Sequence, residues 1–204
     1  MPRITGPTIA AHVAQQEAAV VRAATELFAE RGFAAVTMAD IAERVGLARS
    51  SLYRYFPDKD HILLAWLRRE NAVLVERSRA IAESDAEPQD RLRRWLRLQL
   101  DYLQEPDHQL FAAIASSFGD LEPEVLEAVV EEHRRLYATV EPIVADALQV
   151  SAGGRSRRDP SLIAQLVVGL LRAASEALGR GVPVGRVRRE LERAAVAVVE
   201  ARPG

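Results

Sequence analysis

The stretch TMADIAERVGLARSSLYRYFPDK, residues 37–59, decides the fold of the chain. A helix is expected to begin at Thr37, because a threonine followed three residues later by Asp40 approximates a capping box. Val45-Gly46-Leu47 ends this helix after about two turns, and a further helix is expected from Arg49 to Phe56, where a proline stops it. Two short helices around a glycine predict a helix-turn-helix.

The remainder of the chain also carries helical patterns. Apolar residues recur at three- and four-residue spacing, while alternating runs of β-branched residues are missing, so we expect an all-α protein. A helix should end at Glu30 or Arg31, where Gly32 can take the left-handed conformation. With the helix-turn-helix, about nine helices are expected, those after Pro57 covering 58–81, 88–104, 106–118, 123–150, 160–180 and 184–201. We expect a three-helix helix-turn-helix domain over residues 1–57 and a larger helical domain over residues 58–204.

Composition limits the compartment and the chemistry. The 204 residues contain no cysteine, which excludes disulfides and thiolate metal sites. No apolar run reaches the length of about 18 residues that spans a bilayer, and the N-terminus lacks the pattern of a secretion signal. The four histidines show no metal-ligand spacing. We therefore expect a cytoplasmic protein without membrane, metal or cofactor, and not an enzyme.

Charge gives no global attraction to nucleic acid. The net charge is -2, and residues 1–60 carry seven basic against seven acidic side chains. Any contact with DNA must therefore come from a locally arranged surface.

The segment AATELFAERGFAAVTMADIAERVGLARSSLYRYFPDKDHILLAWL, residues 23–67, resembles the N-terminal pattern of the tetracycline-repressor (TetR) family. The rest of the chain matches that family in length and helix count only. The resemblance implies a transcriptional regulator that binds double-stranded operator DNA through the helix-turn-helix. It also implies a C-terminal domain that binds a small molecule and forms a homodimer through its last two helices. The matching elements are Leu27-Phe28, Thr37, Ile41-Ala42, Val45-Gly46, Leu52-Tyr53, Tyr55-Phe56 and Lys59.

The second short helix supplies the candidates for reading DNA. A helix of this length fits the major groove, and Arg49, Ser50 and Ser51 stand at its exposed N-terminal end. Arg49 can pair with a guanine edge through two hydrogen bonds; the alternative is a solvated surface arginine.

Four further residues match family positions that contact phosphate, namely Thr37, Tyr53, Tyr55 and Lys59. For the two tyrosines, packing in the core is the alternative. Lys59 is the only lysine among 27 basic residues, and its compact charge near a helix N-terminus would attract a phosphate.

Candidates for a ligand pocket are polar or aromatic side chains on apolar stripes, because such groups need a partner when they are buried. For each of them a core position is the alternative, and together they favour a mainly hydrophobic ligand. For dimerisation, small residues four apart in the last helices permit close approach of helices, as at Gly169, Ala173 and Ala177. The pocket candidates are Trp95, Gln99, Tyr102, Phe111, Ile114, Phe118, His133 and Tyr137.

The leading hypothesis is a homodimeric repressor that a small, mainly hydrophobic ligand releases from its operator. The alternative is a helical small-molecule-binding or scaffold protein with a degenerate helix-turn-helix, which the neutral N-terminal charge favours.

Overall fold

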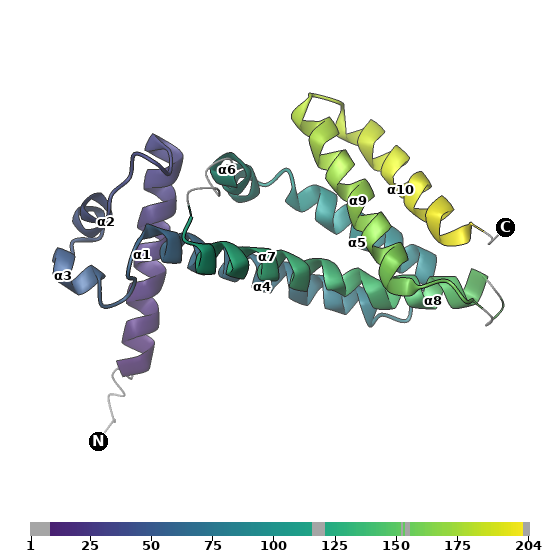
Figure 1. The fold of residues 1–204 in the computed structure, drawn as a ribbon, viewed down its shortest axis with the longest axis horizontal. Helices are drawn as coiled ribbons and strands as arrows, with labels where there is room; N and C mark the ends of the chain where they lie inside the picture. The colour runs from purple at the N-terminus through teal and green to yellow at the C-terminus, as the bar shows by residue number, and fades with distance from the viewer. Residues whose placement is uncertain (1–8, 116–120, 152, 154–155, 202–204) are drawn as a thin grey trace, which may run out of the picture. The chain divides into compact units, whose positions relative to one another are not determined.

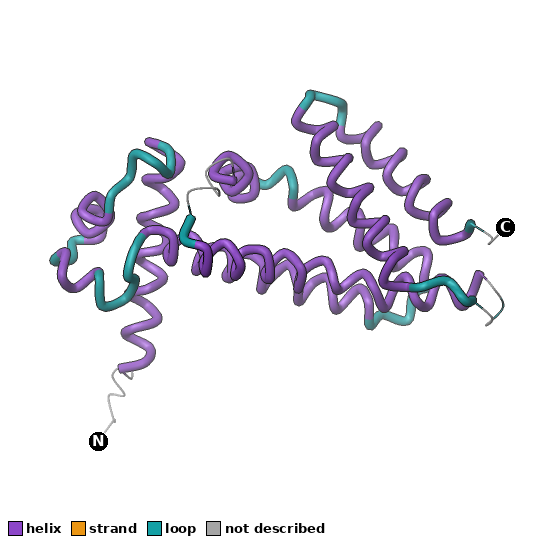
Figure 2. The backbone as a smooth tube through the Cα atoms, viewed as in Figure 1, coloured by secondary structure: helices purple, strands orange, loops and turns teal. Residues whose placement is uncertain are grey.

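The computed structural model describes residues 9–115, 121–151, 153 and 156–201, and these residues form helices joined by loops, without a strand (Figures 1 and 2). The predicted all-α class is confirmed. Contacts divide the chain into two compact units, Met1–Glu70 with Leu110–Val130, and Asn71–Gln109 with Glu131–Gly204. The predicted boundary after residue 57 falls inside the first unit, and the assignment of separate functions to the two domains stays a prediction.

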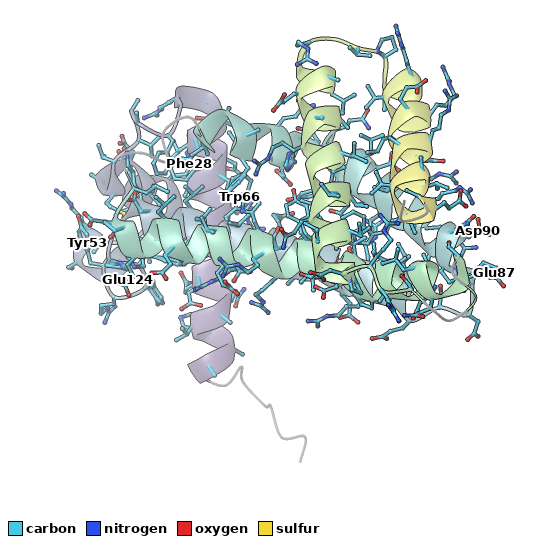
Figure 3. The ribbon with its side chains drawn as sticks, turned by 45° about the vertical axis from the view of Figure 1, so that its right-hand side comes forward. Phe28, Tyr53, Trp66, Glu87, Asp90 and Glu124 are labelled. Carbon is cyan, nitrogen blue, oxygen red and sulfur yellow. The ribbon has the colours of Figure 1, made fainter. Side chains whose placement is uncertain are left out.

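The first unit is built on α1 (Ile9–Arg31), α2 (Met38–Val45) and α3 (Arg49–Leu52), with the first half of α4 (Lys59–Ala82). Parts of α6 (Pro106–Ala115) and α7 (Pro123–Tyr137) complete it. Figure 3 labels two members of its core, Phe28 and Trp66. Other buried members include Val20, Ala24, Leu27, Ile41, Leu52, Phe56, Leu63, Phe111 and Val125.

Local signals set the ends of the helices in the helix-turn-helix. The capping box at α2 is confirmed, with Thr37 as the N-cap and Asp40 bonding back to it. Gly46 ends α2 with a φ of 74°, a left-handed conformation that glycine adopts without steric cost. The next helix, α3, ends at Leu52 rather than at Phe56, although the Phe56 N–H still donates to the Leu52 carbonyl at 3.1 Å.

The second unit contains α5 (Pro88–Tyr102), α8 (Glu141–Ser151), α9 (Pro160–Gly179) and α10 (Val184–Glu200). The last two form a hairpin of adjacent helices (Figure 1). Arg158 joins the start of this hairpin to its end, since its guanidinium donates to the carbonyls of Val198, Val199 and Ala201 at 2.7 to 3.0 Å.

The helix expected over residues 123–150 is interrupted in the structure. It is α7 and α8 separated by the 3₁₀ turn η2 (Ala138–Val140). Pro142 explains the break, because a proline has no N–H to donate to the residue four before it, Ala138, and its ring crowds that carbonyl. The expectation of one continuous helix was wrong at this point.

Candidate functional site

The surface of α3 presents the side chains predicted to read DNA. Arg49 and Ser50 are exposed, and Ser51 is half-buried. Tyr53 is 44% exposed and projects outward from the end of this helix (Figure 3). The Arg49 guanidinium carbon lies 6.0 Å from the centre of the Tyr53 ring, at the limit of a cation–π contact. These side chains therefore share one accessible surface.

Arg54 belongs to the same surface, and the sequence interpretation missed it. It is exposed, and its Nη2 donates to the hydroxyl of Ser51 at 3.3 Å. Its position between two tyrosines of the motif was the signal that could have identified it. The surface formed by Arg49, Ser50, Ser51, Tyr53 and Arg54 is called the α3 surface below.

Tyr55 differs from Tyr53, because it is half-buried and packs against the hydrophobic core of the first unit. Leu52 and Phe56, on either side of it, are buried in that core. The turn after α3 thus exposes Tyr53 and Arg54 to solvent, while Tyr55 and Phe56 fix it to the core.

Thr37 is exposed at the N-terminus of α2, but its hydroxyl already has partners. The oxygen accepts from the Asp40 N–H at 3.3 Å, and the hydroxyl donates to the Asp40 carboxylate. The Thr37 N–H also donates to this carboxylate at 2.8 Å. The hydroxyl and then the N–H of Thr37 lower the pKa of Asp40, because both hydrogen bonds favour the charged carboxylate.

Lys59, the first residue of α4, is half-buried, and its ammonium contacts backbone carbonyls of the first unit. Its Nζ donates to the carbonyls of Phe33, Ala34 and Val36. This lysine therefore has partners within the chain at the position where the sequence predicted a phosphate contact.

Ion pairs engage charged side chains of α1 and α2 in the first unit. Arg44 makes two hydrogen bonds to Glu30, at 2.7 and 3.1 Å, and lies 3.6 Å from Glu26. The bond to Arg44 lowers the pKa of Glu30. Arg31 pairs with Asp40 at 3.3 Å. These carboxylates are thus engaged by arginines of α1 and α2, while neither Arg49 nor Arg54 forms an ion pair with any described residue.

Two of the predicted pocket residues are core residues with hydrogen-bond partners. Trp95 is fully buried, and its indole N–H donates to Thr139 at 2.9 Å. Gln99 is also buried, and its amide donates to Ser78 at 3.1 Å. Both side chains satisfy their polar groups inside the second unit, which fits the alternative of a core position.

Phe111 and Ile114 lie in the core of the first unit. The Phe111 ring packs edge-on against Trp66 of α4, with 6.1 Å between the ring centres. Phe118 lies outside the described residues. Phe111 and Ile114 thus belong to the first unit, while the other described pocket candidates belong to the second.

A cluster of half-buried rings remains in the second unit, and it includes a histidine that the sequence interpretation left out. The ring of His108, on α6, lies 4.9 Å from that of Tyr102, on α5. His133 lies 6.4 Å from Tyr137, both on α7. We call Tyr102, His108, His133 and Tyr137 the ring cluster.

Burial shifts the pKa of two members of this cluster. It lowers the pKa of His108 to about 4, with a smaller contribution from the charge of His133, and it raises the pKa of Tyr137. His108 is therefore a neutral imidazole at neutral pH, able to donate one hydrogen bond and accept another. In the described part of the chain no group of three or more histidine and carboxylate side chains could hold a metal ion.

The outer face of α9 is apolar and exposed. Leu162 is 53% and Leu166 is 49% exposed, and Gly169 and Ala173 continue the exposed face. Of the described helices, only α9 is apolar and long enough to span a membrane, and 28% of its 18-residue window is buried in the chain. A hollow of about 280 Å³ lies between α9 and α10, lined by Leu170, Ala173, Ala174, Ala177, Val182, Arg186, Val187, Glu190, Leu191 and Ala194.

Residues 20–66 match the family model described as bacterial regulatory proteins, tetR family. The chain is 33% identical over 107 residues to the HTH-type transcriptional activator FasR of Mycolicibacterium smegmatis, covering 52% of this chain and 48% of that protein. It is 36% identical over 84 residues to the HTH-type transcriptional repressor KstR2 of Mycobacterium tuberculosis, covering 41% of this chain and 42% of that protein. The matches thus span somewhat less than half the length of these curated relatives.

The fold has solved counterparts over almost the whole chain. One is Thermus thermophilus FadR, a TetR-family transcriptional repressor solved in complex with lauroyl-CoA. It superposes with a TM-score of 0.66 at 21% identity, covering 92% of this chain and 97% of the other. This likeness shows a shared fold.

Proposed function

We propose, from the tetR-family domain that residues 20–66 carry, that the chain is a cytoplasmic transcriptional regulator that binds operator DNA as a homodimer and responds to a small-molecule effector. The observation that carries this proposal is the α3 surface, where Arg49 and Arg54 lack an ion pair with any described residue, while Arg31 of α1 and Arg44 of α2 are paired. Its locally positive charge suits an approach to DNA.

The α3 surface divides into two kinds of contact. We assign Arg49, Ser50 and Ser51 to base edges in the major groove, with Arg49 pairing to a guanine. Tyr53 and Arg54 then contact phosphates and set the register of the protein on the duplex. Thr37 and Tyr55 flank this surface as further phosphate contacts.

The homodimer is proposed to form through α9 and α10. An exposed stripe of Leu162, Leu166 and Ala173 costs solvation free energy until a partner covers it. Arg172 is exposed on the same helix, which favours a protein partner over lipid. Because one short recognition helix reads only a few base pairs, a two-fold mate is needed to read a palindrome.

The effector site is proposed at the ring cluster. Aromatic faces with two imidazoles suit a ligand that is mainly hydrophobic and carries a hydrogen-bonding group. The lauroyl-CoA held by the Thermus protein of similar fold is a ligand of this type, so fatty acyl compounds are the first class to test. Trp95 and Gln99 are left out of this site because both have partners in the core.

Helix α6 is proposed to carry the signal. It supplies His108 to the ring cluster and, one turn later, Phe111 to the core that holds α4 and the helix-turn-helix. A ligand that displaces His108 would move Phe111 against Trp66 and thereby shift the start of α4.

The test uses fluorescence anisotropy with a duplex from the region upstream of the gene for this protein. Arg49→Ala should weaken binding by about ten- to 150-fold, the loss of a bidentate arginine–guanine contact worth about 1–3 kcal/mol. Arg94→Ala, which removes an exposed arginine from α5, is the matched control and should bind like the wild type. Equal affinities of the two variants for the duplex would show that Arg49 does not contact DNA. Absence of binding by the wild type at low salt would contradict the proposal and favour the alternative of a helical small-molecule-binding or scaffold protein with a degenerate helix-turn-helix.

A further inference from the structure

The ammonium group of Lys59 contacts three main-chain carbonyls of one turn. Its Nζ lies 2.9 Å from the carbonyl oxygen of Phe33 and 3.3 Å from those of Ala34 and Val36. An ammonium carries three N–H groups, so these three acceptors use all of them. The Nζ also lies 4.5 Å from the centre of the Phe33 ring, within cation–π distance. We call this arrangement the Lys59 cage.

The cage joins two segments that are 23 to 26 residues apart in sequence. The carbonyls belong to the turn between α1 and α2, which begins at Gly32 with a left-handed φ of 81° and ends at the N-cap Thr37. Lys59 is the first residue of α4. The cage therefore ties the start of α2 to the start of α4, and α3 lies on the chain between these two points.

We infer that Lys59 is a positioning residue for DNA binding, whose ammonium holds the α1–α2 turn and does not bind phosphate. The inference rests on the proposed function and removes the Lys59 ammonium from the expected phosphate contacts. Any phosphate that took this ammonium would have to replace three carbonyl acceptors and a ring contact already in place. The contribution of Lys59 to binding is thus the orientation of the α3 surface.

The cage also explains why this chain keeps a single lysine among 27 basic residues. An ammonium is compact and directs its N–H groups tetrahedrally, so it can reach three carbonyls of one turn at once. A guanidinium is planar and larger, and its fork of donors suits a carboxylate or a phosphate. Arginine would serve well at a phosphate contact but poorly in the cage.

The salt dependence of DNA binding separates the two roles. The affinity falls as salt is added, so a plot of log K against log salt concentration has a negative slope. Each phosphate contact that is lost makes this slope shallower by about 0.9. We expect Lys59→Arg and Lys59→Met to bind the upstream duplex about tenfold more weakly than the wild type, with an unchanged slope. The matched control Arg54→Met removes an exposed basic group from the α3 surface. The slope measured for this variant should be shallower than that of the wild type by about 0.9. Wild-type affinity of Lys59→Arg, or a reduced slope for Lys59→Met, would overturn the inference.

Acetylation of the wild-type protein gives a second test that requires no variant of Lys59 to fold. Because Lys59 is the only lysine, an acetylating ester modifies the amines of Lys59 and the N-terminus, and mass spectrometry of the peptide that contains residue 59 reads its modification separately. We expect slow acetylation at the same rate with and without DNA. The lysine introduced by Arg54→Lys provides the reference, and it should react at least about tenfold faster in free protein.

Fast acetylation of Lys59 that DNA suppresses would identify a phosphate contact and overturn the cage. Failure of the wild type to bind DNA would instead overturn the proposed function. The acetylation rate of the free protein tests whether the carbonyls hold the Lys59 ammonium, whether or not the protein binds DNA. This rate depends on the contacts of Lys59 alone.

Discussion

At the scale of single residues, the hydroxyl of Thr37 has one proton and two candidate acceptors for it, the Asp40 carboxylate and a phosphate of DNA. The proton goes to the Asp40 carboxylate, while the oxygen accepts from the Asp40 N–H and thereby caps α2. A phosphate that accepted this proton would break the bond to the carboxylate and leave the N-cap intact. The capping contribution of Thr37 can therefore be measured apart from DNA.

Thr37→Ala should lower the free energy of unfolding by about 1 kcal/mol, because an alanine at the N-cap leaves a backbone N–H of the first turn without an acceptor. For a chain of this size, the melting temperature should fall by roughly 2–4 °C. Differential scanning calorimetry measures the change. Thr37→Ser keeps the hydroxyl and should melt like the wild type, and a full loss in that variant would show that the hydroxyl is not the stabilising group.

The sequence predicted the Thr37–Asp40 cap because its two members are three residues apart. It could not predict the partners of Trp95 and Gln99, which come from Thr139 and Ser78, 44 and 21 residues away. Periodicity places a polar side chain on a buried face without identifying what it meets there. A satisfied core residue and a ligand contact therefore have the same appearance in sequence.

At the scale of elements, α6 is short but contributes to both units. His108 packs in the ring cluster, and Phe111 packs against Trp66. The buried imidazole makes this helix sensitive to pH, because the pKa of His108 falls to about 4, from an ordinary value of 6.5. Between these two values the unfolded chain binds a proton that the folded chain does not.

The melting temperature should therefore fall as the pH is lowered from about 6.5 towards 4, since protons favour the unfolded state in this window. His108→Gln should flatten this dependence, because an amide has no proton to bind over the range. His12→Gln, at an exposed histidine of α1, is the control and should leave the slope as in the wild type. Identical pH profiles for His108→Gln and wild type would contradict the burial of a neutral His108.

Most element types followed from the sequence, and the exceptions have local causes. The helix-turn-helix was predicted from a cap, a glycine and a proline. The apolar stripe of residues 123–150 predicts one continuous helix, but Pro142 lacks the N–H that a continuous helix needs and the helix breaks at η2. Residues 53–56 continue helical hydrogen bonds beyond α3 without extending the helix, so the pattern predicted a longer element than the structure has.

At the scale of the whole molecule, the balanced charge of the N-terminal sequence does not show which of its charged side chains are paired. Arg44 and Arg31 are paired with Glu30 and Asp40. Sequence counts cannot reveal this pairing, because Arg44 and Glu30 are 14 residues apart on different helices. The division into two units was likewise beyond the sequence, since the first unit takes residues 110–130 from far along the chain.

Leu166→Glu tests the proposed homodimer. A charge in the middle of an apolar interface must be desolvated, and burial of a leucine contributes about 1.5–3 kcal/mol, so dimer affinity should fall by more than about tenfold. Sedimentation velocity at low micromolar concentration should show a monomer. Val73→Glu introduces the same charge at an exposed valine of α4 and should sediment like the wild type. A dimeric Leu166→Glu variant would place the interface elsewhere.

The most direct measurement of the central claim is a titration of two duplexes of equal length with the wild-type protein, at one fixed salt concentration. One duplex carries the sequence upstream of its own gene, and the other carries that sequence scrambled. A regulator reading bases through two α3 surfaces should bind the first at least about 10³-fold more tightly, with two chains or a multiple of two per duplex. Equal affinity for both duplexes, or no binding to either at low salt, would contradict the account.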